Sequence, residues 1–160
     1  MNGASHQQKV PMPKHSEIRN MPYTASQMYS LVADVERYPE FLPWCSAARV
    51  RSVVKIGDTE VMQADLVISF KVFRERFGSQ VTLWPKIRKI DTEYLDGPFK
   101  YLQSTWAFAD TDQGCAVEFS VDFEFRNVLL QKIIGVVFDQ AMHRIVRAFE
   151  DRAKDLYGKN

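Results

Sequence analysis

Residues 117–125 alternate strictly between apolar and polar side chains. Val117, Phe119, Val121, Phe123 and Phe125 occupy the odd positions, and charged or small polar residues occupy the even ones. Successive side chains of a strand point to opposite faces, so this segment is predicted to be a strand with one apolar and one solvated face. The apolar face needs a partner element to cover it.

Directly after this strand the apolar spacing changes from two residues to three and four. The apolar positions of this second segment are Leu130, Ile133, Ile134, Val137, Phe138, Ala141, Ile145, Ala148 and Phe149. This spacing predicts an amphipathic helix of about 28 residues, roughly 42 Å long. Because such a helix is longer than a typical strand, we expect only a curled sheet to wrap around it.

The remaining elements are predicted from alternation and from turn residues. Strand-like runs cover residues 47–55, 59–70, 73–83, 86–95, 100–109 and 116–126, and a short strand covers 15–22. Thr24 or Ser26 caps a helix that ends near residue 33, and Pro39 and Pro43 limit a second short helix. Strands followed by a covering helix predict an α+β fold with an antiparallel sheet.

Length and composition restrict the class of protein. The 160 residues suit one domain, which we place at 14–158, behind a polar leader (1–13) predicted to be disordered. A net charge of +1 gives no electrostatic case for DNA binding. Two isolated cysteines, Cys45 and Cys115, are expected to be free thiols. No apolar run is long enough to span a membrane, so we expect a soluble, cytoplasmic protein.

Motifs for catalysis and for metal or nucleotide binding are missing from the sequence. His6, His15 and His143 are scattered, and the seven glycines are too widely spaced for a phosphate-binding loop. We therefore predict no metal site and no cofactor. His143 lies near the edge of the helical apolar stripe, where it would act as a general base, orient a carbonyl ligand, or simply pack at the rim.

Bulky side chains dominate the predicted inward faces. Aromatic residues make up 12% of the chain, and eleven of them are phenylalanines. Such side chains either close into a solid core or line a cavity between the sheet and the helix, and spacing alone does not separate these readings. The segment with Tyr38, Phe41, Leu42 and Trp44 is interpreted as a ligand gate, a membrane-dipping loop or a hydrophobic plug.

Basic residues gather at two places. Arg74 and Arg76 flank Glu75, whereas Lys86, Arg88 and Lys89 follow a Trp-Pro turn. Either group is a candidate contact for phospholipid head groups or RNA phosphate, and the alternative is an ordinary solvated face.

Three separated motifs resemble a known family. They are 38–45 (YPEFLPWC), 96–102 (DGPFKYL) with Trp106 and Phe108, and 117–125. Together they resemble the coenzyme Q-binding START-like family, which is similar to polyketide cyclases and includes ribosome-association toxins. The resemblance implies a helix-grip (START/Bet v 1-like) fold, in which about seven curved antiparallel strands wrap a long C-terminal helix after two short helices. It further implies non-catalytic binding of ubiquinone, or a similar isoprenoid lipid, in support of respiration.

On this basis we predict a hydrophobic tunnel and gate. Its residues are Leu42, Trp44, Phe70, Phe73, Phe77, Tyr94, Phe99, Trp106, Phe108, Phe119, Phe123, Phe138 and Met142, with His143 as a polar orienting group. Two alternatives stay open. A ribosome-binding module would use the basic residues, and a cyclase-type enzyme would need inward acid/base groups such as His143, Tyr94 or Tyr101. Peripheral contact with the inner membrane is a further expectation.

Overall fold

The computed structural model describes residues 14–158, so the predicted leader 1–13 lies outside the described residues. Its strands are β1 (Lys14–Met21), β2 (Cys45–Ile56), β3 (Thr59–Phe70), β4 (Phe73–Trp84), β5 (Lys89–Asp96), β6 (Phe99–Thr111) and β7 (Gly114–Phe125). Its helices are α1 (Ala25–Ala33), a short 3-10 helix (Val35–Glu40) and α2 (Val128–Tyr157). The predicted α+β fold with seven strands and a long C-terminal helix is confirmed.

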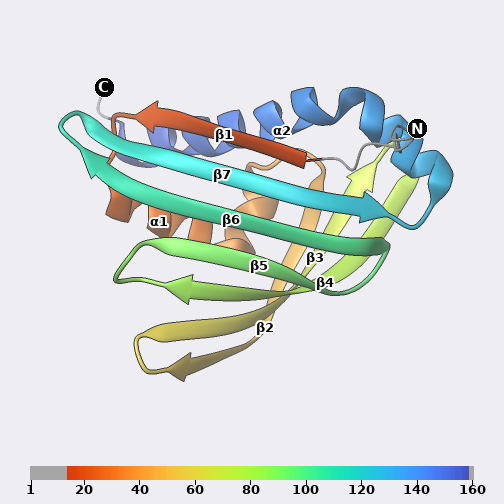
Figure 1. Ribbon diagram of the computed structural model, residues 1–160, viewed down its shortest axis with the longest axis horizontal. Helices are drawn as coiled ribbons and strands as arrows, with labels where there is room; N and C mark the ends of the chain where they lie inside the picture. The colour runs from red at the N-terminus through yellow and green to blue at the C-terminus, as the bar shows by residue number, and fades with distance from the viewer. Residues whose placement is uncertain (1–13, 159–160) are drawn as a thin grey trace, which may run out of the picture.

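All seven strands form one antiparallel sheet in the order β1-β7-β6-β5-β4-β3-β2. Figure 1 shows β3 and β4 running obliquely to β6 and β7 and reaching toward the start of α2, so the sheet curls around the helix. The apolar row of β7 faces inward, with Val117 1% and Phe119 5% exposed. Within residues 14–158, no helix has the length and apolar character needed to cross a membrane.

One predicted boundary was wrong. The strand predicted to begin at residue 86 begins at Lys89, because residues 85–88 form a turn in which Arg88 has φ 50°. That left-handed backbone conformation is incompatible with an extended strand.

The two halves of α2 meet the sheet differently. The second half packs against α1 in a filled core, where Val146 is 1% and Ala153 0% exposed, and Phe149, 2% exposed, lies between this core and the cavity described below. Phe149 contacts the rings of Trp106, at 5.0 Å between centroids, and of Phe41, at 5.2 Å. Several side chains of residues 134–149 border open space between the helix and the sheet instead. The junction between β7 and α2 therefore leads into a cavity.

The helix α1 begins with a complete capping box. The Thr24 hydroxyl accepts a hydrogen bond from the Gln27 amide at 3.0 Å, and the Gln27 side chain accepts one from the Thr24 amide at 3.0 Å. A Thr24→Ala substitution is expected to lower the free energy of unfolding by about 1 kcal/mol, because the cap is lost. Denaturant unfolding measures this change, with Thr111→Ala as a control on an exposed threonine. Equal losses in both variants would contradict the capping role.

Candidate functional site

An apolar cavity of about 550 Å³ lies between the curled sheet and residues 134–149 of α2. Its walls come from β3 to β7, from α2 and from the segment that precedes β2. The volume falls in the range of small-molecule sites, about 300–1,000 Å³. Among the lining residues that the structure describes there is no carboxylate and no histidine, and the charged ones are Lys71 and Arg144.

Nine of the predicted tunnel residues lie in this lining. They are Leu42, Trp44, Phe70, Phe77, Phe99, Trp106, Phe119, Phe123 and Met142. The structure adds residues that the sequence reasoning missed, among them Ile134, Val137 and Ala141 of α2, and Leu66 and Ile68 of β3. Their places in the helical stripe and in the alternating row were the available signals. That these side chains contact a ligand stays a prediction.

Four predicted tunnel residues lie outside the lining. Phe108 packs against Tyr29 of α1, at 6.1 Å between ring centroids, and Phe138 packs against Phe123 at 5.2 Å. The Tyr94 hydroxyl accepts a hydrogen bond from the Phe99 amide at 3.1 Å. Phe73 pairs with Phe70 where β3 turns into β4. All four therefore contact neighbouring residues but do not border the cavity.

Three segments bring partly exposed lining residues together, and we infer that the cavity opens there. Trp44 follows the 3-10 helix, Phe70 ends β3, and Arg144 lies on α2. The Trp44 ring contacts Phe70 at 6.1 Å between centroids, and the Arg144 guanidinium lies 5.1 Å from the Trp44 ring centroid. Trp44 also has φ 65°, a conformation uncommon for a bulky residue. Strain of this kind gathers at binding sites, which fits the gate predicted for this segment.

A few polar side chains interrupt the apolar lining of the cavity. Ser79, Thr92 and Ser104 lie on adjacent strands of the sheet and line the cavity, and Gln140 lines it from α2. Burial raises the pKa of the Cys45 thiol, which also lines the cavity, to about 11. This thiol is therefore neutral at physiological pH. All of these side chains can hydrogen-bond an uncharged ligand.

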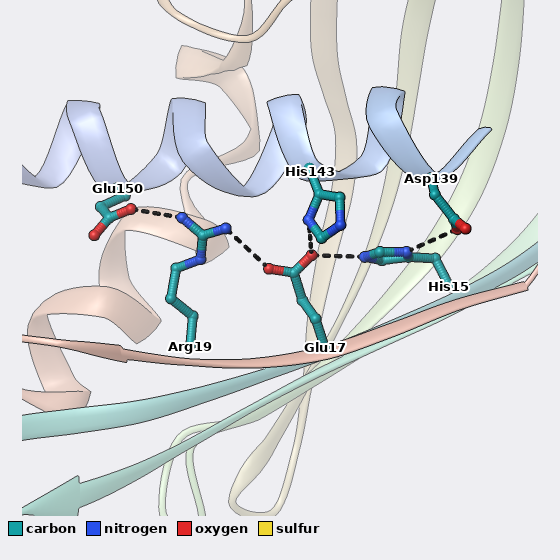
Figure 2. A network of polar contacts seen from close by, with 6 residues as sticks. All are labelled: His15, Glu17, Arg19, Asp139, His143 and Glu150. Carbon is teal, nitrogen blue, oxygen red and sulfur yellow. Dashed lines mark hydrogen bonds and ion pairs between the residues drawn. The ribbon is translucent and has the colours of Figure 1, made fainter. Parts of the chain in front are cut away.

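A second polar arrangement joins β1 to α2 (Figure 2). His15, Glu17 and Arg19 share one face of β1, and Asp139, His143 and Glu150 share the face of α2 that meets it. We name these six residues the β1–α2 seam. The Glu17 carboxylate receives hydrogen bonds or ion pairs from His15 at 2.6 Å, His143 at 3.0 Å and Arg19 at 3.3 Å.

The electrostatics of the seam centre on Glu17. Burial alone would raise the pKa of its carboxyl group, but the hydrogen bond from His15 and the charges of Arg19 and His143 outweigh burial and lower it. Burial alone would lower the pKa of Arg19, but the hydrogen bonds and charges of Glu150 and Glu17 together outweigh desolvation and raise it. His143, predicted to orient a ligand from within the tunnel, faces Glu17 instead and is not among the cavity-lining residues.

The five predicted basic contacts are engaged with neighbouring polar groups. Arg76 pairs with Asp65 at 2.6 Å and Asp96 at 3.1 Å, and Arg74 bonds Ser46 and Ser69 at 3.3 Å. The other three pair with carboxylates: Lys86 with Asp58, Arg88 with Asp110 and Lys89 with Asp91. The nearby carboxylates reduce the positive potential of both groups. Contact with a phosphate-bearing partner stays a prediction.

The fold and cavity can be compared with known proteins. Residues 21–150 match the family profile described as polyketide cyclase/dehydrase and lipid transport. The chain belongs to this family. This membership confirms the resemblance seen in the sequence motifs.

Among its relatives in the polyketide cyclase/dehydrase and lipid transport family, a ribosome association toxin RatA from Rickettsia prowazekii is 38% identical, over 89% of this chain and 96% of that protein. A coenzyme Q-binding protein COQ10 homolog B, mitochondrial, from Xenopus laevis is 32% identical, over 91% of this chain and 60% of that protein. The solution structure of an 18 kDa protein from Caulobacter crescentus is 33% identical, covers 92% of this chain and all of that chain, and superposes with a TM-score of 0.78.

The aromatase/cyclase ZhuI from a Streptomyces species shares the fold, with a TM-score of 0.74, over 90% of this chain and 94% of that chain. Its sequence identity of 15% supports the fold alone.

Proposed function

We propose that this protein binds ubiquinone or a similar isoprenoid lipid in the cavity between the sheet and α2, and acts as a non-catalytic carrier or chaperone for it. The observation that carries the proposal is the cavity itself, about 550 Å³ and walled mainly by aromatic and aliphatic side chains. At ~25 cal/mol per Å², burial of some 400 Å² of isoprenoid tail contributes roughly 10 kcal/mol before the costs of binding.

The polar groups of the lining suit an uncharged quinone head. A quinone ring offers carbonyl and ether oxygens, which accept hydrogen bonds but do not donate them. The hydroxyls of Ser79, Thr92 and Ser104 and the amide of Gln140 are donors on the cavity wall. The 32% identity to a protein named for coenzyme Q binding supports the same ligand class.

The side chains that line the cavity favour a carrier over an enzyme. Acid/base catalysis on a polyketide needs a residue that exchanges protons near neutral pH. The described lining holds no carboxylate or histidine, its thiol Cys45 is held neutral, and burial raises the pKa of Tyr38 well above its ordinary value. The candidates Tyr94, Tyr101 and His143 all lie outside the lining.

Contact with a membrane surface would let such a carrier load its lipid. Val72 is 92% exposed at the turn between β3 and β4, beside Lys71 at the cavity mouth. Val136, on the same half of α2 that covers the cavity, is 86% exposed. Exposed apolar side chains beside a cation are suited to binding an anionic lipid surface.

Tryptophan fluorescence tests the ligand. Trp44 and Trp106 line the cavity, and Trp84 does not. A short-chain ubiquinone analogue, whose ring quenches indole emission, is expected to quench two of the three tryptophans in a saturable titration. The Trp84→Phe variant lacks the tryptophan that lies outside the cavity. The analogue should therefore quench nearly all of the tryptophan emission of this variant. Quenching that is linear and unsaturable, as in collisional encounters, would count against a bound ligand.

A second candidate function is association with the ribosome. It rests on relatives named ribosome association toxin, such as one from Escherichia coli that is 37% identical over 93% of this chain and 92% of that protein. Co-sedimentation with ribosomal subunits is expected to fall at high salt and on reversing the charges of Lys86, Arg88 and Lys89. The matched control reverses Lys132 and Arg147, two exposed cations of α2 that belong to neither basic group. Sedimentation that does not depend on salt or on these charges would remove this candidate.

A further inference from the structure

The β1–α2 seam contains a group of ligand atoms that the proposed lipid binding does not use. Nε2 or Nδ1 of His15, a carboxylate oxygen of Glu17 and a ring nitrogen of His143 all lie within 4.8 Å of one another. None of these three residues lines the cavity. The sequence predicted no metal site because the histidines are far apart along the chain. Folding brings them together from β1 and α2.

The donor set is one that divalent transition metals prefer. Two imidazole nitrogens and one carboxylate oxygen form a recurrent Zn²⁺ set, with bonds of about 2.0–2.2 Å and therefore donors about 3.3 Å apart. Oε1 of Glu17 lies 2.6 Å from Nε2 of His15 and 3.0 Å from Nδ1 of His143. Widening these separations by about 0.7 Å and about 0.3 Å would admit the ion. The His143 side chain is 51% exposed and has room to adjust.

The outer groups of the seam already orient these donors (Figure 2). Nδ1 of His15 faces Oδ1 of Asp139 at 3.2 Å, which leaves Nε2 directed at Glu17. Oε2 of Glu17 is held by Arg19 at 3.3 Å, which leaves Oε1 for an ion. A carboxylate behind a ligating histidine is a usual feature of zinc sites, because it fixes the ring and its tautomer.

Charge and access also suit a dication. The seam holds three carboxylates and one guanidinium, a net charge of −2 when both histidines are neutral. His15 and Glu17 expose only 6% and 12% of their side chains, so their donors are held by packing. The half-exposed His143 leaves a path to solvent and a place for a water molecule as fourth ligand.

We propose that Nε2 of His15, Oε1 of Glu17 and Nδ1 of His143 form a binding site for Zn²⁺ or a similar divalent transition metal. On binding, the ion takes the place of the hydrogen bonds that His15 and His143 make to Oε1 of Glu17, and a proton on either coordinating nitrogen moves to the other nitrogen of its ring or is released to solvent. The ion then links β1, at the edge of the sheet, to the helix that covers the cavity. Because it binds the folded chain and not the unfolded one, it stabilises the fold.

Isothermal titration of the full chain with Zn²⁺, after removal of metal by a chelator, tests the site. A His6→Asn background removes the third histidine of the chain. We expect one ion per chain, a raised melting temperature, and a visible d–d spectrum with Co²⁺ that lacks an intense thiolate band. The His143→Asn variant should lose the spectrum. Asp139→Asn should weaken binding by about 10- to 100-fold through loss of the orienting carboxylate.

The control is Asp151→Asn, which makes the same charge change at an exposed position of α2. It should leave the affinity unchanged. Because Asp139 exposes 75% of its side chain, its variant folds even if His143→Asn does not. The proposal is overturned if the parent chain shows no saturable binding, or if Asp139→Asn and Asp151→Asn bind equally. Lipid uptake is measured in a separate experiment. The metal-site proposal and the lipid-binding proposal can therefore fail independently of each other.

Discussion

The Ala141→Trp variant is expected to bind a ubiquinone analogue about 100-fold more weakly than the parent chain, a loss of ~2.7 kcal/mol. Ala141 lies on α2 and lines the cavity. Its methyl group leaves space that an indole ring would occupy, in competition with the isoprenoid tail. The fold should tolerate the change, because the new ring enters existing space instead of packed core. Tryptophan-independent detection, such as calorimetry, measures the affinity.

The matched control is Ala148→Trp, on the same helix but outside the cavity lining. It should bind the analogue like the parent chain. Circular dichroism and thermal melts of both variants check that the fold is kept. Equal affinities for the parent chain and Ala141→Trp would mean that the ligand does not use this cavity.

The Phe99→Ala variant is expected to lose about 3–5 kcal/mol of unfolding free energy. Phe99 is 1% exposed and contacts the rings of Phe77, Phe123 and Phe125, with centroids 5.2, 5.4 and 4.6 Å away. Removing its ring takes contacts from two other strands, β4 and β7, and leaves a void in a packed wall. For a chain of this length the melting temperature should fall by roughly 10 °C.

Phe70→Ala provides the comparison, because Phe70 also lines the cavity but is only half-buried, at the mouth. Its loss should cost clearly less stability and instead impair retention of the lipid. Denaturant unfolding separates the two variants. If Phe70→Ala destabilises the chain as much as Phe99→Ala, the mouth is ordinary core and no gate exists there.

The regular elements could be predicted from the sequence because each has a clear period. Alternation over 117–125 predicted β7, and the three- and four-residue spacing after it predicted α2. The nine predicted residues that lie in the cavity lining follow from the same alternation combined with the family resemblance. The start of β5 was predicted three residues too early, because a left-handed turn at Arg88 is not visible in the hydrophobic pattern.

Other features depend on relations that a single sequence does not display. Spacing identifies which residues face inward but not whether they fill the space, so the cavity next to a filled core was not predictable. In β1 a polar side chain is buried and an apolar one is exposed, the opposite of the usual arrangement. His15, 8% exposed, faces the helix, whereas Ile18 is 68% exposed. The polar residues at every second position of β1 meet Asp139, His143 and Glu150 of α2 only in the folded chain.

Native mass spectrometry of the protein purified from quinone-containing cells tests the central claim most directly. We expect a complex with one isoprenoid quinone per chain, present in the parent protein and in Ala148→Trp but lost in Ala141→Trp. Lipid-free parent protein, together with no thermal shift on adding quinone, would contradict it.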